Sequence, residues 1–244
     1  MKAALHAEVL KITTVRGLWL GVVLATVAVP LFSLLVVGTG GLGVEDTVTS
    51  GAATGTIVGL LAFGAWAGSL AAGEYVHHTI SVSLATVPRR NVLYGAKLAA
   101  TSAAAGTGAL VSAIAAVLIV RLAAAPGEHE LGTPPALLAL VAAVVAVAVL
   151  GAAVGMVTRS TTASITIVAL AVLLPKAAGG LLGGLEPWVV GASPGTVVTQ
   201  VVGGAQLASD QTYPPGDLAA VATMLAVAAI VAAVGAVVLQ RRDG

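Results

Sequence analysis

The side chains that could do chemistry in this 244-residue sequence are few, and their spacing fits neither catalysis nor metal binding. Glu128, His129 and Glu130 are metal-ligating residue types, but three adjacent residues rarely converge on one ion. His77 and His78 have no further ligands to complete a set. No Ser-His-Asp or His-Glu-x-x-His arrangement can be assembled. We therefore expect no catalytic site and no bound metal.

The sequence also contains no nucleotide site. A Gly-x-x-x-x-Gly-Lys-Ser/Thr string, which would cradle phosphates, does not occur. Gly38 to Gly43 fits the Gly-x-Gly-x-x-Gly pattern, but it follows an apolar stretch of membrane-span length instead of the strand of a βαβ unit. We expect no cofactor on this chain, and any ATP and Mg²⁺ must bind to a separate subunit.

Glu74 is the carboxylate whose charge would be most costly without water or a cation beside it. It lies where an apolar stretch of membrane-span length ends, and an unpaired carboxylate is expensive at that depth. It must therefore reach water or pair with a cation. Downstream, an apolar run at residues 80–87 ends at Pro88, and Arg89 and Arg90 can then meet anionic lipid or acidic groups of a partner.

The composition indicates which solvent surrounds these groups. Hydrophobic residues make up 58% of the chain and charged residues only 9%, whereas about a quarter of a soluble domain is charged. The chain must be solvated by lipid. The absence of cysteine excludes disulfides and thiolate metal sites. A net charge of +1 gives no indication of nucleic acid as a partner.

The apolar stretches have the length of membrane helices. A bilayer core of roughly 30 Å needs about 20 apolar residues in a helix, and the alternation typical of a β-barrel is missing. We expect an all-α integral membrane protein in which residues 1–244 form a single transmembrane domain. Its six spans are predicted at residues 17–37, 52–72, 99–120, 136–157, 161–182 and 218–239.

The distribution of Lys and Arg predicts the orientation. With both termini in the cytoplasm of a bacterial inner membrane, nine of the eleven basic residues lie inside, and only Arg121 and Lys176 lie outside. The reversed topology would break the positive-inside rule. The inside set is Lys2, Lys11, Arg16, Arg89, Arg90, Lys97, Arg159, Arg241 and Arg242.

Three connecting regions differ in character. Residues 2–16 place Leu5, Val9 and Ile12 at helical spacing, which predicts an amphipathic helix on the inner leaflet. Residues 73–97 form a long cytoplasmic loop. Residues 183–216, between the fifth and sixth spans, are unusually apolar, and we interpret them as a re-entrant or interfacial helical segment shielded by protein.

The segment after the second predicted span resembles the permeases of type-2 ABC exporters. The shared order is Glu74-Tyr75, then Thr79-Ile80, an apolar run, Pro-Arg-Arg and a Lys that opens the next span. The topology of six spans with both ends inside is similar over the whole chain. One departure is His78, because the family usually has Gly before the Thr, and this leaves the local turn open.

The resemblance implies a role for each matching residue. The 73–97 loop would contain the coupling helix, and Thr79 to Leu84 would enter a groove of the ATPase subunit, including Ile80. Glu74 would tie this helix to the N-terminal connecting helix, through Lys11 or Arg16. The residues that match the connecting helix are Glu8, Lys11 and Arg16. Arg89 and Arg90 would fix the loop at the lipid headgroups. Tyr75 and His78 complete the ATPase-coupling set.

Two residues are candidates for a substrate path. Trp66 lies in the glycine-rich second span, and Lys176 follows Pro175 near the outer end of the fifth. Snorkelling to the headgroups also explains Lys176. Small residues recur four apart, as at Gly64 and Gly68 or Gly151 and Gly155, and such spacing allows helices to approach closely.

The function that the resemblance implies is the permease subunit of an ATP-driven exporter. We expect two ATPase copies, a second permease copy or paralogue, membrane lipid, and a hydrophobic or amphipathic cargo such as a drug, lipid or small peptide. Two alternatives remain open. One is a secondary transporter or channel, against which the absence of mid-span carboxylates counts. The other is a membrane scaffold.

Overall fold

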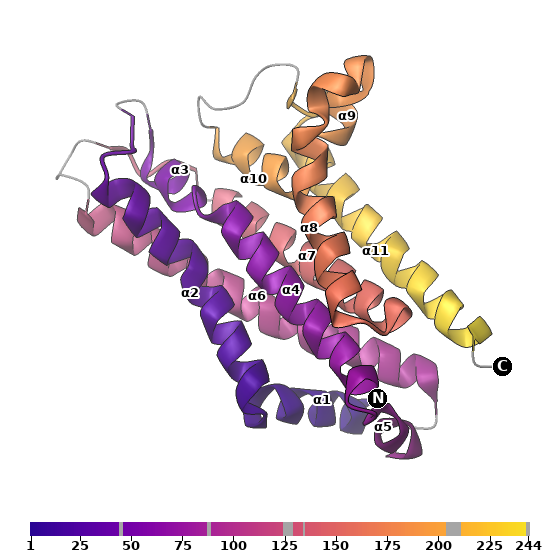
Figure 1. Ribbon diagram of the computed structural model, residues 1–244. Coiled ribbons are helices and arrows are strands. Elements are labelled where there is room, and N and C mark those ends of the chain that lie inside the picture. Colours follow the sequence, from indigo (N-terminus) through magenta and orange to yellow (C-terminus); the bar gives the residue numbers. More distant parts are fainter. Residues whose placement is uncertain (44–45, 87–88, 124–128, 134, 204–210, 243–244) are drawn as a thin grey trace.

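The computed structural model describes the whole chain except residues 44–45, 87–88, 124–128, 134, 204–210 and 243–244 (Figure 1). The described elements are all helical, as the composition predicts. In order they are α1 (Lys2–Thr14), α2 (Arg16–Gly38), α3 (Val48–Ala53), α4 (Thr56–Val76), α5 (Ile80–Thr86), α6 (Arg90–Ala123), α7 (Pro135–Thr158), α8 (Thr161–Ala177), the 3₁₀ turns η1 (Gly179–Leu181) and η2 (Gly183–Leu185), α9 (Glu186–Val189), α10 (Pro194–Val202) and α11 (Asp217–Arg242).

Five of these segments are long and apolar enough to cross a membrane: α2, α3 with α4, α6, α7 and α11. The protein is thus a multi-pass membrane protein of helices. The predicted fifth span, 161–182, is shorter than expected, since α8 contains 17 residues and ends at Ala177. At 1.5 Å per residue α8 is about 26 Å long.

The helix bounds differ most from prediction between residues 73 and 97. This region is not a loop: α4 continues to Val76, α5 forms a separate short helix, and α6 begins at Arg90, nine residues before the expected third span. The 34 residues of α6 extend about 51 Å, well beyond a bilayer core. Lys97 therefore lies within a helix, two turns from its start.

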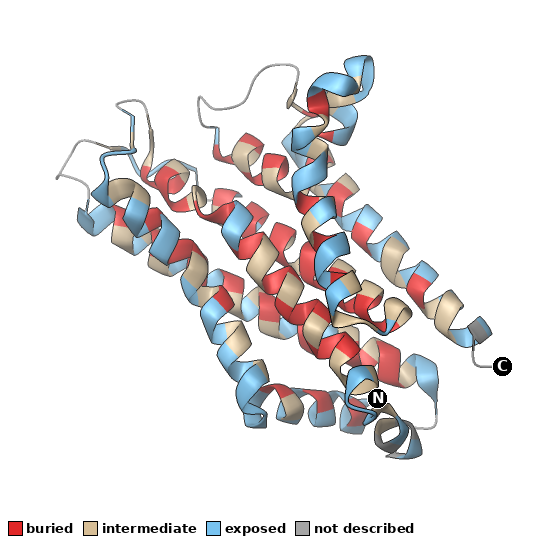
Figure 2. Ribbon diagram, viewed as in Figure 1, coloured by how far each residue is buried: buried red, intermediate tan, exposed pale blue. Residues whose placement is uncertain are grey.

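The core is built around α4 and α7. Both helices carry a continuous row of buried residues, whereas α2 and α11 are buried on one narrow side only (Figure 2). Large apolar side chains on the outer faces of α2 and α11 are exposed, for example Leu24 at 68% and Ile230 at 62%. In a membrane protein such faces meet lipid or another subunit.

Glycine allows α4 and α7 to approach each other. A Cβ atom at Gly155 would lie 2.6 Å from the Gly68 carbonyl oxygen and 3.2 Å from the Ala72 nitrogen. Gly151 meets the Gly64 carbonyl in the same way. The predicted close approach at the Gly64/Gly68 and Gly151/Gly155 pairs is confirmed. Gly183, in contrast, has no atom near its would-be Cβ.

The apolar region after α8 forms η1, η2, α9 and α10, with residues 204–210 outside the described part. Gln200 of α10 fixes this region to the start of α11: its amide donates to Asp217 Oδ1 at 2.7 Å, and its Oε1 accepts from the Tyr213 backbone at 2.9 Å. Helical pieces are present where they were expected. Re-entry into the bilayer stays a prediction.

Replacing Gly155 with alanine will test the helix crossing. The added methyl meets the backbone of α4, which cannot rotate away, so we expect the loss of about 1–3 kcal/mol that overpacking costs. The control is Gly95→Ala in α6, where nothing lies within 4 Å of the added carbon. Thermal unfolding in detergent should show a lower Tm for Gly155→Ala only. Equal Tm values would contradict the packing described.

Candidate functional site

The predicted connecting and coupling segments, residues 2–16 and 73–97, lie together at one end of the molecule. The interfacial-looking α1 runs across this end, α5 lies beside it, and the last turn of α4 and the first turns of α6 meet between them (Figure 1). We refer to this as the α1 end. The α7–α8 turn and the end of α11 also lie there.

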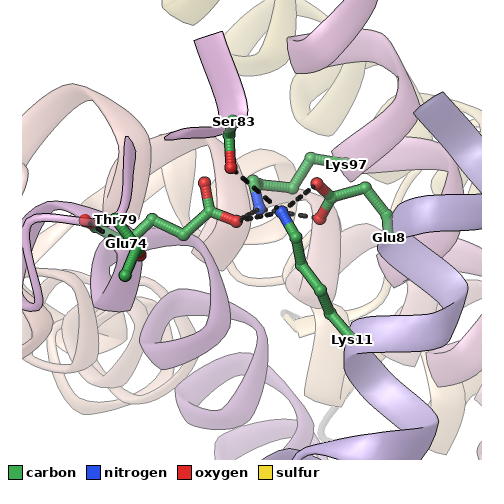
Figure 3. A network of polar contacts seen from close by, with 6 residues as sticks. All are labelled: Glu8, Lys11, Glu74, Thr79, Ser83 and Lys97. Atoms are coloured by element: carbon green, nitrogen blue, oxygen red, sulfur yellow. Dashed lines mark hydrogen bonds and ion pairs between the residues drawn. The ribbon is translucent and has the colours of Figure 1, made fainter. Parts of the chain in front are cut away.

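Four charged residues from three helices form a closed ring at the α1 end, which we name the charge cluster: Glu8, Lys11, Glu74 and Lys97 (Figure 3). Lys11 Nζ lies 2.7 Å from Glu8 Oε1 and 2.6 Å from Glu74 Oε1. Lys97 Nζ lies 2.8 Å from Glu8 Oε2 and 2.8 Å from the same Glu74 oxygen. Each lysine thus bridges both carboxylates, and the formal charges cancel.

The cluster is largely withdrawn from solvent. The side chains of Lys97 and Glu8 are 2% and 3% exposed, that of Glu74 11%, and only Lys11 reaches the surface at 35%. A buried charge is tolerated when it is paired and hydrogen-bonded. Removal of one member would leave the others uncompensated, so α1, α4 and α6 depend on one another here.

Burial and pairing act on Lys11 in opposite directions. Burial, the largest single effect, lowers the pKa of its ammonium, but hydrogen bonds to Glu74 and Glu8 and the attraction of both carboxylates together outweigh it. The pKa of Lys11 is raised above its ordinary value of 10.5. Lys11 therefore carries a full charge at neutral pH.

The cluster extends to α5 through one hydroxyl. Lys11 Nζ donates to Ser83 Oγ at 3.2 Å, which joins α5 to α1 directly. Glu74 Oε2, the carboxylate oxygen outside the ring, is buried and has no hydrogen-bond partner among the described residues. The side chains of Val82 and Leu84 on α5 lie outside the described part, so the predicted docking role of Leu84 is untouched by the structure.

A tight turn joins α4 to α5. His78 adopts a left-handed backbone with φ +55°, and the Thr79 backbone N–H donates to the Glu74 carbonyl at 2.9 Å. Glycine adopts this conformation without cost, whereas a side chain disfavours it. The turn is thus one that suits glycine, although the chain has histidine there. Ile80 begins α5 directly after it and is half-buried.

Tyr75 connects the same turn to the next loop on this end. The Arg159 guanidinium lies over its ring, 5.1 Å from the centroid, a distance at which a cation is attracted to an aromatic face. Arg159 itself lies between α7 and α8 with φ +56°. The α7–α8 turn is thereby held against the end of α4.

The remaining predicted residues of this end are exposed. Arg89 and Arg90 lie at the start of α6, and Arg16 begins α2 away from the charge cluster. Of the two partners proposed for Glu74, Lys11 is confirmed and Arg16 is wrong.

The side of the N-terminal helix that packs inward is not its row of apolar residues, and its predicted position on the inner leaflet stays a prediction. Ile12 is buried, but Leu5 and Val9 are 36% and 41% exposed, and the face of α1 that packs inward carries Ala4, Glu8 and Ile12. The physical reason is Glu8. Its carboxylate must reach Lys97, and this requirement turns its own face of the helix inward.

The two candidate residues for a substrate path have different surroundings. Trp66 is buried, and its indole N–H donates to the Leu18 carbonyl at 2.9 Å, so it fastens α4 to α2. Lys176 is exposed and lines two hollows of about 320 and 110 Å³ between α4, α8 and α10, together with Ile57 and Thr199. Because it lines these hollows, Lys176 is a better candidate for a substrate path than the buried Trp66.

Sequence reasoning missed the central position of Lys97 and did not consider Ser83 or the Tyr75–Arg159 contact. Lys97 was assigned to a loop because the third span was placed too late. The sequence indicates only that a helix could begin soon after Pro88, since no further proline precedes Lys97, although Gly95 lies between them. In the described part of the chain no three His, Asp or Glu residues are close enough to hold a metal ion.

Comparison with known proteins gives no relative. No family model matches the chain, and neither a curated protein nor a solved structure is similar to it at a significant level.

Glu8→Ala and Lys97→Ala will each leave a buried charge without its counter-charge. We therefore expect each to destabilise the protein by about 3–5 kcal/mol. The double variant should lose much less than the sum, because neither charge is then left alone. Thermal unfolding in detergent measures all three, with Arg16→Ala as the exposed control. Additive losses would contradict a shared ring.

The raised pKa of Lys11 predicts how stability depends on pH. The folded pKa exceeds the unfolded one, so the stabilisation from Lys11 is fully present below pH 10.5 and is lost as pH rises through the folded value. The Tm difference between the wild type and Lys11→Met should therefore stay constant from pH 7 to pH 10 and shrink above. A difference that shrinks between pH 7 and pH 9 would contradict the pairing.

Proposed function

We propose that this chain is the membrane subunit of an ATP-driven exporter of the type-2 ABC class. It moves a hydrophobic or amphipathic substrate, such as a drug, lipid or small peptide, out of the cytoplasm of a bacterial cell. The ATP is hydrolysed by two copies of a separate ATPase subunit, and a second permease copy or paralogue completes the path.

The observation that carries this proposal is the charge cluster. An ATPase acts on its permease from outside the bilayer, so the force must enter through a short surface helix and reach the spans. The α5 helix is such an element, and Lys11 links it to α1, to the end of α4 and, through the shared carboxylates, to α6. Displacement of α5 would then move three helices together.

The proposed orientation puts the α1 end in the cytoplasm. Eight of the nine basic residues predicted to be inside lie in the helices and turns of this end and have described side chains: Lys2, Lys11, Arg16, Arg89, Arg90, Lys97, Arg159 and Arg241. In this proposal α8 also crosses the bilayer, as the fifth of six spans. Its length of about 26 Å is short but within the usual range, and it runs from the α7–α8 turn back to the end that holds α9 and α10 (Figure 1).

Other surfaces fit the remaining parts of the proposal. The exposed Leu5 and Val9 on α1 suit an inner-leaflet interface. The exposed apolar faces of α2 and α11 offer contact to lipid or to the second permease copy. The hollows beside Lys176 lie at the end of the molecule that the proposal places outside.

A secondary transporter is the second candidate, and Glu74 favours it. Its buried, unpartnered Oε2 is the kind of carboxylate oxygen that ion- or proton-coupled carriers use. The two functions differ in their energy source. Transport by the isolated chain in proteoliposomes that responds to a proton gradient would support the carrier and contradict the exporter.

Purification of the tagged chain from its native membrane tests the exporter directly. We expect an ATPase with a phosphate-binding loop to copurify in a one-to-one ratio. Ala85→Glu places a charge on the exposed side of α5 and should abolish the association. Leu181→Glu, 89% exposed at the other end, is the matched control. Absence of any ATPase from the wild-type preparation would contradict the proposal.

Glu74→Gln will separate ATP hydrolysis from export. The amide keeps the size of the side chain but weakens its contacts with Lys11 and Lys97. The connection from α5 through Lys11 to the end of α4 is thereby weakened. We expect substrate stimulation of the ATPase to fall about tenfold, a coupling loss of about 1.4 kcal/mol, with normal membrane insertion. The control Glu186→Gln, on α9, should retain stimulation. A normal stimulated rate in Glu74→Gln would refute the coupling role.

A further inference from the structure

The two hollows beside Lys176, at the end of the molecule opposite α1 (Figure 1), differ in their walls. We name the one of about 110 Å³ the polar hollow and the one of about 320 Å³ the apolar hollow. They share Ile57, Lys176, Gly195 and Thr199. The remaining described lining of the polar hollow comes from α10 and from the segment that leads through α3 into α4: Asp46, Ser50, Ala53, Thr54, Thr56 and Val202.

Two opposite charges face the polar hollow without forming an ion pair. Among the residues that the structure describes, Lys176 forms neither a hydrogen bond nor an ion pair. Asp46 is fixed in place, because its Oδ2 accepts from the Gly43 backbone N–H at 2.8 Å and its Oδ1 accepts from the Ser50 hydroxyl at 3.3 Å. A carboxylate has about four acceptor positions. Asp46 therefore retains capacity for a further donor in the hollow.

The threonine hydroxyls of the polar hollow can act only as acceptors for a ligand. Thr54, Thr56 and Thr199 each donate their hydroxyl hydrogen to a backbone carbonyl, at 2.7, 2.6 and 3.0 Å. A ligand group at this wall must therefore bring its own donors, and the Asp46 carboxylate favours a group with positive charge. A primary ammonium meets both requirements, because it carries a charge and N–H donors but no acceptor.

The apolar hollow continues from Lys176 along the side of α8. Val172 and Leu173 line it about one helical turn before Lys176, toward the middle of α8. In the proposed membrane orientation this wall lies deeper in the bilayer than the ammonium of Lys176. Ile57 and Leu173 are also exposed on the outside, at 39% and 45%, so an apolar chain can enter the hollow from the lipid.

We propose that the two hollows together bind an amphipathic zwitterion. Its anionic group meets Lys176, its primary ammonium meets Asp46, and its apolar chain lies along Val172 and Leu173. As the substrate class of the exporter, this inference rests on the proposed function. Binding itself needs no ATPase, so the site can be tested separately on the isolated chain.

Native mass spectrometry of the full chain in detergent measures this binding. The probe is lysophosphatidylethanolamine, which has a phosphate, a primary ammonium and one acyl chain. Lysophosphatidylglycerol has the phosphate without an ammonium, and the cation of lysophosphatidylcholine has no N–H donor. We expect the ethanolamine probe to bind about tenfold more tightly than either, or better. Phosphoethanolamine, which lacks the acyl chain, should displace it only at a concentration about tenfold higher or more.

Asp46→Asn separates a specific effect from misfolding. The amide keeps an oxygen for the Gly43 N–H but removes the charge, so the variant should bind lysophosphatidylethanolamine and lysophosphatidylglycerol equally well, whereas a misfolded chain would bind neither. Lys176→Met should weaken the binding of both by about tenfold. The matched controls are Glu130→Gln and Arg121→Met, exposed residues that line neither hollow. Both should keep the preference of the wild type.

Three results would overturn the zwitterion site. They are equal binding of the ethanolamine probe and either other lysolipid to the wild type, an unchanged preference in Asp46→Asn, and an unchanged affinity in Lys176→Met. Displacement by phosphoethanolamine as effective as that by the lysolipid would refute the place assigned to the apolar chain. None of these results depends on an ATPase, whose copurification tests the exporter independently.

Discussion

The cost of burying charge governs the α1 end of this protein. Lys97 is almost fully enclosed in a chain with very few charged residues, and it is tolerated there because Glu8 and Glu74 both reach it within 2.8 Å. The two carboxylates need a second cation, which Lys11 supplies. From this requirement follow the inward face of α1, the position where α4 ends, and the early start of α6. A ring of four charges thus fixes three helices that apolar packing alone would leave free to slide, since lipid provides no hydrophobic force between them.

The ring also explains why α5 matters. The Lys11–Ser83 hydrogen bond attaches α5 to the charge cluster. The left-handed turn at His78 brings α5 back toward α1 instead of away from it. A short helix attached in this way to the charge cluster is suited to transmit a displacement to α1, α4 and α6.

Part of this could be predicted from the sequence, and the reasons are physical. The helical membrane fold follows from the number of apolar residues, and the need of Glu74 for water or a cation follows from the cost of an unpaired carboxylate at the end of a span. Lys11 as its partner was implied, beside Arg16, only by the resemblance to type-2 ABC exporter permeases. The Gly64/Gly68 and Gly151/Gly155 contacts follow from spacing. Lys97 could not be placed, because burial of a lysine depends on two carboxylates, one of them nearly ninety residues away, that no local pattern connects to it. The inward-packing face of α1 could not be predicted for the same reason, because it follows from Glu8 reaching Lys97, whereas Leu5, Val9 and Ile12 indicate only an amphipathic helix. The length of α8 depends on how the segment after it packs, which periodicity does not report.

The account requires the α1 end, with α5 and its attachment, to face the compartment that contains ATP. Since the chain has no cysteine, single substitutions report accessibility without background. The most direct measurement is labelling of Ser81→Cys on α5 and of Leu181→Cys at the opposite end with a membrane-impermeant maleimide. In intact cells only Leu181→Cys should react, and Ser81→Cys should react after permeabilisation. Labelling of Ser81→Cys in intact cells would place α5 outside, where no ATPase could reach it, and would contradict the account.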